Sequence, residues 1–160
     1  MNSDFLILTR FNDWQAVDFG VKTKKLRIRK KMKNIAFNLG MGTLFTHELD
    51  AMQNHEWIIL PLTSWLPDEY GMMVFLVFHI PFFAGLIALV SIKNDKIRIP
   101  GKLAISLFLI VHSVLRVVFM SHADYEFSSV LSNALIFGGA FFGIVYLLYQ
   151  YNFKEMLFKK

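Results

Sequence analysis

Four long apolar segments alternate with short polar stretches along the chain. They cover residues 34–57, 71–92, 103–120 and 130–151. The segments are long and do not alternate in polarity, although the outer half of the first one is polar, and this pattern predicts helices instead of strands. A helix needs about 20 apolar residues to cross the hydrocarbon core of a bilayer. The pattern therefore predicts an all-α, polytopic membrane protein built as a bundle of four transmembrane helices.

Two flanking regions lie outside this membrane domain of residues 34–153. Residues 1–33 mix apolar and charged residues and end in a basic run at 22–33, and residues 154–160 form a basic tail. The N-terminal extension fits either an amphipathic helix at the membrane surface or a disordered segment. We interpret the basic run as a solvated flank of the membrane rather than as a specific lipid-headgroup site.

Composition agrees with lipid as the solvent of the membrane domain. The chain is 55% hydrophobic and 18% charged, whereas a soluble domain usually carries about 25% charged residues. It contains no cysteine, which excludes disulfides and thiolate metal sites. The net charge is +5, but the basic residues lie beside apolar segments. The lipid bilayer, and not nucleic acid, is therefore the expected partner.

The distribution of Lys and Arg predicts the orientation in the membrane. Of the 17 such residues, 16 precede the first segment, lie between the second and third, or follow the fourth. The other two connections contain none and carry acidic residues instead. By the positive-inside rule both termini face the cytoplasm. The expected location is the bacterial cytoplasmic membrane.

Ionisable residues inside the apolar segments are the most informative exception to this pattern. The first segment holds His47, Glu48 and Asp50, the second holds His79, and the third holds His112 and Arg116. A charged group at membrane depth is costly and is rarely kept without a use. A rise of ~1.5 Å per residue places the three histidines at similar depth, in the outer half of the bundle. They are therefore expected to face one another.

The residue types at this depth favour a metal site. Imidazole and carboxylate groups are ligands of zinc, iron and manganese. We predict His47, His79 and His112 as ligands of one divalent ion. Glu48 or Asp50 would serve as general base, and Arg116 as the counter-charge of these carboxylates. A second polar group is expected at the outer mouth of the bundle: His55, Glu56, His122, Asp124 and Glu126.

Three functions are compatible with such a site. The first is a metal-dependent enzyme that acts on a lipid or amphiphile. The second is a proton-handling, ion-handling or small transport protein, for which four helices would require an oligomer. The third is a structural or accessory subunit whose polar network only fixes helix packing. The sequence alone leaves these three open.

Two further positions concern helix packing. Gly139 and Gly143 form a small-xxx-small pair, which lets a neighbouring helix approach closely. We interpret it as packing within the bundle. Pro81 lies two residues after His79 and predicts a kink, either for packing or to let backbone line a cavity.

The segment His47-Glu48-Leu49-Asp50-Ala51, followed by His55-Glu56-Trp57, resembles the opening motif of a family of small prokaryotic membrane proteins of unknown function. The segment Phe78-His79-Ile80-Pro81 resembles the second-helix motif of that family, and His112 and the region of His122 resemble its later histidines. The likeness covers residues 35–149. More distantly, the chain is similar to the HXXEE domain family. The resemblance implies a four-helix fold and the location of the site, but no reaction.

Overall fold

The computed structural model describes the backbone of residues 3–122 and 125–158, and the side chains of residues 23–122 and 125–151. Its elements are α1 (Ser3–Gln53), the short 3-10 helix η1 (Glu56–Ile58), α2 (Asp68–Ser91), α3 (Asp95–Phe119) and α4 (Val130–Phe158). The described residues contain no strand. The prediction of an all-α fold with four long helices is confirmed.

Three of these helices are long and apolar enough to cross a membrane: α2, α3 and residues 130–151 of α4. Between 6% and 33% of the residues in these spans are buried inside the protein. Most of their apolar side chains therefore face outward, which suits a lipid environment and not water. The chain has the features of a helical membrane protein. The fourth span in the first segment and the cytoplasmic termini stay predictions.

Helix α1 is continuous with the basic run but ends earlier than the first apolar segment. Both the backbone N–H and the side-chain Nδ2 of Asn54 donate to the carbonyl of Asp50, at 3.0 and 2.7 Å. His55 then takes a left-handed backbone conformation, with φ 49° and ψ 43°, which a right-handed helix cannot include. The predicted segment reached Trp57, whereas the helix ends at Gln53.

Helix α3 begins earlier than the third apolar segment, which was predicted from residue 103. The side chain of Asn94 accepts a hydrogen bond from the backbone N–H of Lys96 at 3.0 Å and so caps the helix before Asp95. This cap lets the polar residues that precede the apolar run join the helix. Helix α2 runs through Pro81 as one element.

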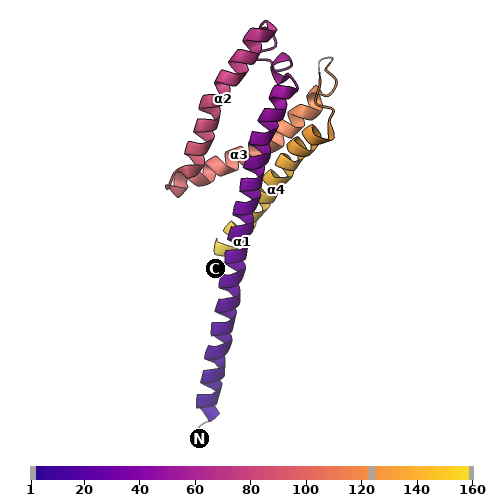
Figure 1. Cartoon of the computed structure of the whole chain (residues 1–160). Coiled ribbons are helices and arrows are strands. Elements are labelled where there is room, and N and C mark those ends of the chain that lie inside the picture. The colour runs from indigo at the N-terminus through magenta and orange to yellow at the C-terminus, as the bar shows by residue number, and fades with distance from the viewer. Residues whose placement is uncertain (1–2, 123–124, 159–160) are drawn as a thin grey trace.

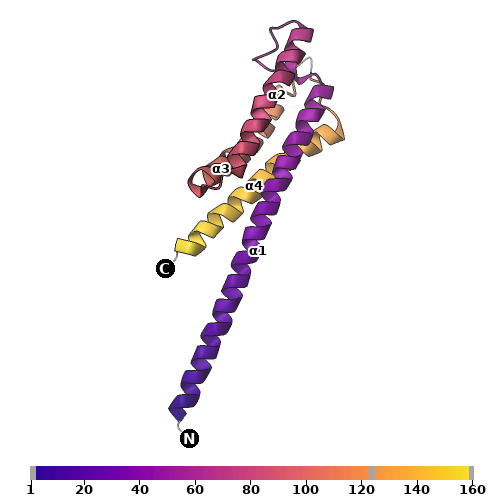
Figure 2. The same cartoon turned by 60° about the vertical axis from the view of Figure 1, so that its left-hand side comes forward.

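The other helices pack against α1 to different extents (Figure 1). Helices α1 and α4 make the most extensive contact, and α3 packs against α4. Helix α2 packs on α3 and η1 and stands to one side of the other helices (Figures 1 and 2). The N-terminal part of α1 projects well beyond the bundle in both views.

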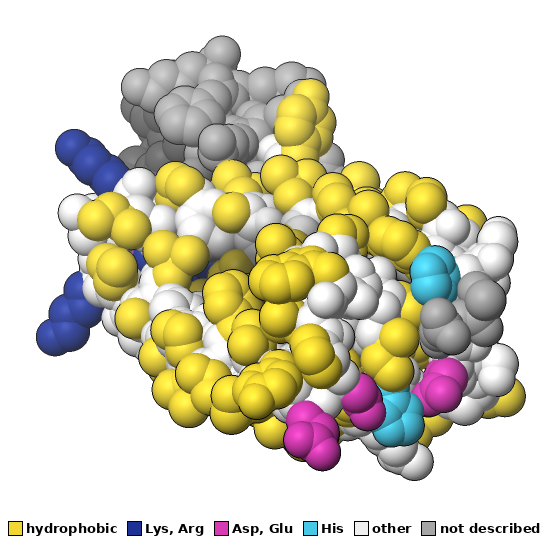
Figure 3. All heavy atoms as spheres, turned by 90° about the horizontal axis from the view of Figure 1, so that it is seen from above, with side chains coloured by type: hydrophobic (Ala, Val, Ile, Leu, Met, Phe, Trp, Pro, Cys, Tyr) yellow, Lys and Arg dark blue, Asp and Glu magenta, His cyan; other side chains and the backbone are white. Residues whose placement is uncertain are grey.

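The two ends of the bundle differ in charge. Figure 3 looks onto the end that carries η1, where acidic and histidine side chains lie among hydrophobic ones. The Lys and Arg side chains visible in this view project only from the rim. This charge separation follows the sequence pattern from which the orientation is predicted.

Two apolar clusters hold the helices together. One joins α1, α3 and α4 and contains Ala36, Phe37, Met41, Ile105 and Tyr146. The other joins the end of α1, η1, α2 and the α3–α4 connection and contains Ala51, Trp57, Ile59, Phe75 and Phe127. His47 lies between Met41 and Ala51 on the same buried stripe of α1. The candidate polar site therefore sits between the two clusters.

The glycines of α4 let other helices approach closely, as the small-xxx-small pair predicts. A Cβ atom at Gly143 would lie 2.7 Å from the carbonyl oxygen of Ser106 on α3. A Cβ atom at Gly139 would lie 3.2 Å from Oγ1 of Thr43 on α1. These contacts lie within one chain, in agreement with packing inside the bundle.

Replacement of Gly143 by alanine is expected to destabilise the fold. The added methyl group would collide with backbone of α3 rather than with a flexible side chain, and overpacking of this kind costs about 1–3 kcal/mol. Thermal unfolding in detergent measures the effect. Gly138→Ala is the matched control, because a Cβ there meets nothing within 4 Å. Equal stability of the two variants would show that the helices can separate without cost.

Candidate functional site

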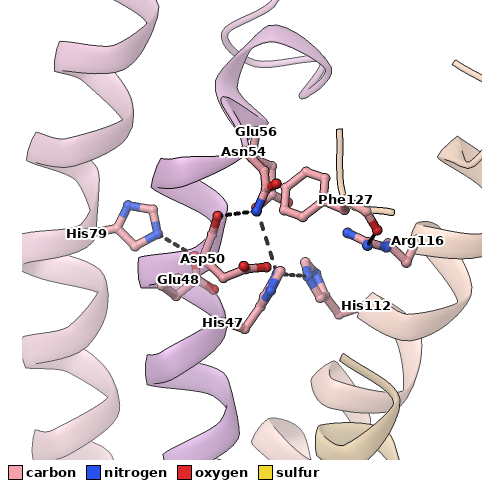
Figure 4. Close-up of polar contacts among 9 residues, drawn as sticks. All are labelled: His47, Glu48, Asp50, Asn54, Glu56, His79, His112, Arg116 and Phe127. Carbon is pink, nitrogen blue, oxygen red and sulfur yellow. Dashed lines mark hydrogen bonds and ion pairs between the residues drawn. The ribbon is translucent and has the colours of Figure 1, made fainter. Parts of the chain in front are cut away.

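The first polar residues of the site come from the inner face of α1. His47 is 2% exposed, and Glu48 and Asp50 are also buried. Successive residues on a helix point about 100° apart. His47 and Glu48 therefore reach different neighbours: His47 points toward His112 on α3, and Glu48 toward His79 on α2 (Figure 4).

His47, Glu56 and His112 form a group with the geometry of metal ligands. The Nε2 atom of His47 lies 2.9 Å from Nε2 of His112 and 3.8 Å from Oε2 of Glu56. One ligand atom from each of the three residues lies within 4.8 Å of the others. Ligands bonded at ~2.0–2.1 Å to one tetrahedral ion are roughly 3.3 Å apart. The three side chains can therefore coordinate one ion after small adjustments.

Glu56 reaches this group because the chain reverses at the end of α1. The left-handed turn at His55 starts η1, and η1 carries Glu56 into the site, where it is buried. Glu56 lies in η1, outside the three helices that are long and apolar enough to cross a membrane. A cation between Glu56 and the two histidines would favour the ionised carboxylate.

His79 belongs to a second pair rather than to this group. Its Nε2 atom lies 2.8 Å from Oε2 of Glu48, and its Nδ1 atom lies 2.6 Å from the carbonyl oxygen of Phe75. Because a carbonyl only accepts, Nδ1 carries a hydrogen and donates it. One further proton is then shared between His79 and Glu48, as imidazolium with carboxylate or as neutral imidazole with carboxylic acid.

Two buried polar atoms of α1 lack a hydrogen-bond partner among the described residues. They are Nδ1 of His47 and Oδ2 of Asp50. Nearly all buried polar groups in proteins are hydrogen-bonded. This part of the site therefore has unused capacity for a ligand or for water.

A cavity of about 450 Å³ lies between the Glu48–His79 pair and the candidate metal ligands, of which Glu56 and His112 line it. Its polar lining residues are Glu48, Glu56, Thr63, His79 and His112. The rest of its wall is apolar and comes mainly from α2 and α3, with Phe75, Phe78, Phe82, Phe108 and Leu115. An apolar cavity with a few convergent polar groups is the usual form of a small-molecule site.

Comparison with known families places the chain in one of them. The model of DUF6713, a family of unknown function, matches residues 33–153. The chain belongs to DUF6713. The predicted membership of an uncharacterised family is thereby confirmed, whereas its motif and the likeness to the HXXEE domain family stay predictions. A search of the curated proteins and a search of the solved structures found no match.

Arg116 contacts the connection between α3 and α4 in this DUF6713 protein. It is 6% exposed, and its Nη2 atom donates to the carbonyl of Phe127. The guanidinium group lies 4.2 Å from the ring centroid of Phe127 and 4.7 Å from that of Tyr125. The sequence predicts Glu48 or Asp50 as its partner. Among the described residues it forms no ion pair within 4.0 Å.

Replacement of Arg116 by methionine is expected to destabilise the protein. The variant leaves the carbonyl of Phe127 without its donor, which costs about 1–3 kcal/mol, and removes cation–π contacts worth roughly 0.5–2 kcal/mol. Thermal unfolding in detergent measures the loss. Lys96→Met, an exposed position on the same helix, is the control. A variant as stable as the control would assign Arg116 a role outside packing.

The residues predicted at the outer mouth separate into different environments. His55 and Glu126 form an ion pair of 2.7 Å, with side chains 48% and 53% exposed. His122 is exposed, and Asp124 lies outside the described residues. Glu56, the remaining member, points into the site of the DUF6713 fold. The sequence could not predict that Glu56 points inward, because its direction depends on the left-handed turn at His55.

Proposed function

We propose that this protein binds one divalent metal ion at His47, Glu56 and His112 and hydrolyses an amphiphilic substrate inside the membrane. One observation carries the proposal: ligand atoms of two histidines and one glutamate lie within 4.8 Å of one another. Of these residues, Glu56 and His112 line a largely apolar cavity. Two histidines and a glutamate with an open fourth position are a ligand set of hydrolytic zinc sites.

Glu48 is the general base in this proposal. A metal ion held by His47, Glu56 and His112 would lower the pKa of a coordinated water to about 7 and so supply a nucleophile at neutral pH. In the hydrolysis of an ester, the water oxygen bonds to the carbonyl carbon while its proton passes to Glu48. The bond from that carbon to the leaving oxygen then breaks, and Glu48 returns the proton to the leaving oxygen.

His79 is a positioning residue for Glu48. Its Nδ1–H donates to the carbonyl of Phe75, which fixes the direction of the ring. The opposite nitrogen then faces the carboxyl group of Glu48 at 2.8 Å. This contact holds the carboxyl group at the cavity wall and stabilises its negative charge before the first proton transfer and after the second.

The cavity suits the apolar part of an amphiphile. Its phenylalanine-rich walls would take an acyl chain, and its polar end would face the carbonyl group to be cleaved. Helix α2 stands to one side of the other helices (Figure 1), and its cavity-lining residues Val74 and Phe78 are also exposed on the outside of the bundle, which favours entry from the lipid. With both termini in the cytoplasm of a bacterial cell, the substrate would enter from the outer leaflet.

A proton-handling function is the second candidate. The close approach of the two Nε2 atoms of His47 and His112, at 2.9 Å, also suits a hydrogen bond in which one ring donates to the other. Together with the Glu48–His79 contact, the His47–His112 contact would give α1 two hydrogen bonds that each hold a proton. This candidate predicts proton flux across vesicles and no requirement for metal. A polar network of purely structural use predicts neither flux nor metal.

Metal analysis of protein purified without chelators tests the proposal. We expect about one equivalent of zinc, iron or manganese per chain. Hydrolysis of fluorogenic fatty-acyl esters in mixed micelles should stop on addition of a chelator and return when metal is restored. Protein that holds less than a tenth of an equivalent and takes up none of the three metals would refute it.

A further inference from the structure

A second hollow lies far from the histidine site, where α1, α3 and α4 meet beside the basic run. Its volume is about 420 Å³, and Tyr146 of α4 forms part of its wall. Its charged lining residues are Lys30 and Lys33 of α1 and Asp95, Arg98 and Lys102 of α3. Four cations and one carboxylate leave it with a net charge of +3. Lys33 is 14 residues from His47, or ~21 Å along α1.

Contacts within the protein hold these cations in place. Nζ of Lys33 donates to Oε1 of Gln150 at 2.7 Å, and Nζ of Lys102 lies 4.5 Å above the ring of Phe37. Arg98 pairs with Asp95. Burial lowers the pKa of Lys33, and the ammonium group of Lys102 lowers it further. Like charges confined in a half-buried hollow repel one another, and a bound anion would relieve this repulsion.

We propose that this hollow binds a phosphate group, either that of an anionic phospholipid or free phosphate. Lysine ammonium groups bind phosphate oxygens as point charges, and arginine binds them through two parallel hydrogen bonds. The exposed apolar side chains of α1 include Ile28 and Met32 within the basic run and continue with Ile35 beyond it. A headgroup in the hollow would therefore lie at the boundary between the basic run and the apolar segment.

Thermal unfolding of the full chain in detergent tests this site with three additives: phosphatidylglycerol, phosphatidylcholine and inorganic phosphate. We expect phosphatidylglycerol to raise the unfolding temperature at lower concentration than phosphatidylcholine does. The double variant Lys33→Gln/Lys102→Gln should need about 30-fold more phosphatidylglycerol for the same shift, since each basic residue near an anionic headgroup contributes about 1 kcal/mol. Stabilisation by inorganic phosphate that is lost in the same variant would identify free phosphate as the ligand.

Lys24→Gln/Lys31→Gln is the matched control, because it removes the same charge from the basic run outside the hollow and should bind like the unmodified chain. Lys30→Gln provides a second test at an exposed position and should weaken binding about 5-fold. Equal losses in the control and the Lys33/Lys102 variant would overturn the proposal, as would equal stabilisation by both lipids together with no effect of phosphate. The metal content of all variants should stay unchanged, so this test is independent of the proposed hydrolysis.

Discussion

Replacement of His112 by alanine is expected to remove the bound metal ion. The variant leaves His47 and Glu56 as the only ligands of the group, and a structural or catalytic zinc site needs at least three protein ligands. Mutation of a residue that only hydrogen-bonds to a metal ligand typically lowers metal affinity about 10–100-fold. Loss of a ligand itself should therefore lower it by more than about 100-fold. Metal analysis measures how much metal each variant holds, and competition with a chromogenic chelator measures its metal affinity.

His79→Ala is the informative companion to this variant. The sequence predicts His79 as a ligand, whereas the geometry pairs it with Glu48 and gives the third ligand position to Glu56. We therefore expect His79→Ala to retain metal and Glu56→Gln to lose it. His122→Ala, at an exposed histidine, controls for the loss of an imidazole. Metal loss in His79→Ala with retention in Glu56→Gln would restore the ligand set that the sequence predicts.

Replacement of Glu48 by glutamine is expected to abolish most of the hydrolytic activity while the metal stays bound. Glutamine keeps the shape of the side chain but cannot accept a proton from water, and a positioned general base contributes about 10²–10⁴-fold to a rate. The decrease should appear in kcat. Hydrolysis of a fatty-acyl ester by metal-loaded protein in micelles, with metal content measured on the same samples, checks this prediction.

Two acidic positions serve as controls for Glu48. Glu69→Gln makes the same change at an exposed site in the first turn of α2 and should leave activity intact. Asp50 is the other base that the sequence allows, but it does not line the cavity. We expect Asp50→Asn to lower activity far less than Glu48→Gln. The reverse order of these two effects would transfer the role of base to Asp50.

Several features of the fold and site could be predicted from the sequence because they depend on neighbours along the chain. Apolar run length determines the number of long helices, and helical periodicity places His47 and Glu48 on the buried side of α1. The close approach at Gly143 follows from a missing side chain. The predicted meeting of His47 and His112 follows from depth, since two polar rings in apolar helices are buried at least cost against each other.

Tertiary structure alone decided which carboxylate joins the two histidines. Glu56 enters the site because His55 adopts a left-handed conformation after α1 ends, and no periodic pattern encodes such a reversal. The partner of Arg116 was decided in the same way, by the path of the α3–α4 connection that brings the carbonyl of Phe127 to its guanidinium group. Backbone carbonyls occur at every residue. A sequence therefore shows where polar groups must be satisfied, whereas only the folded chain determines which group satisfies them.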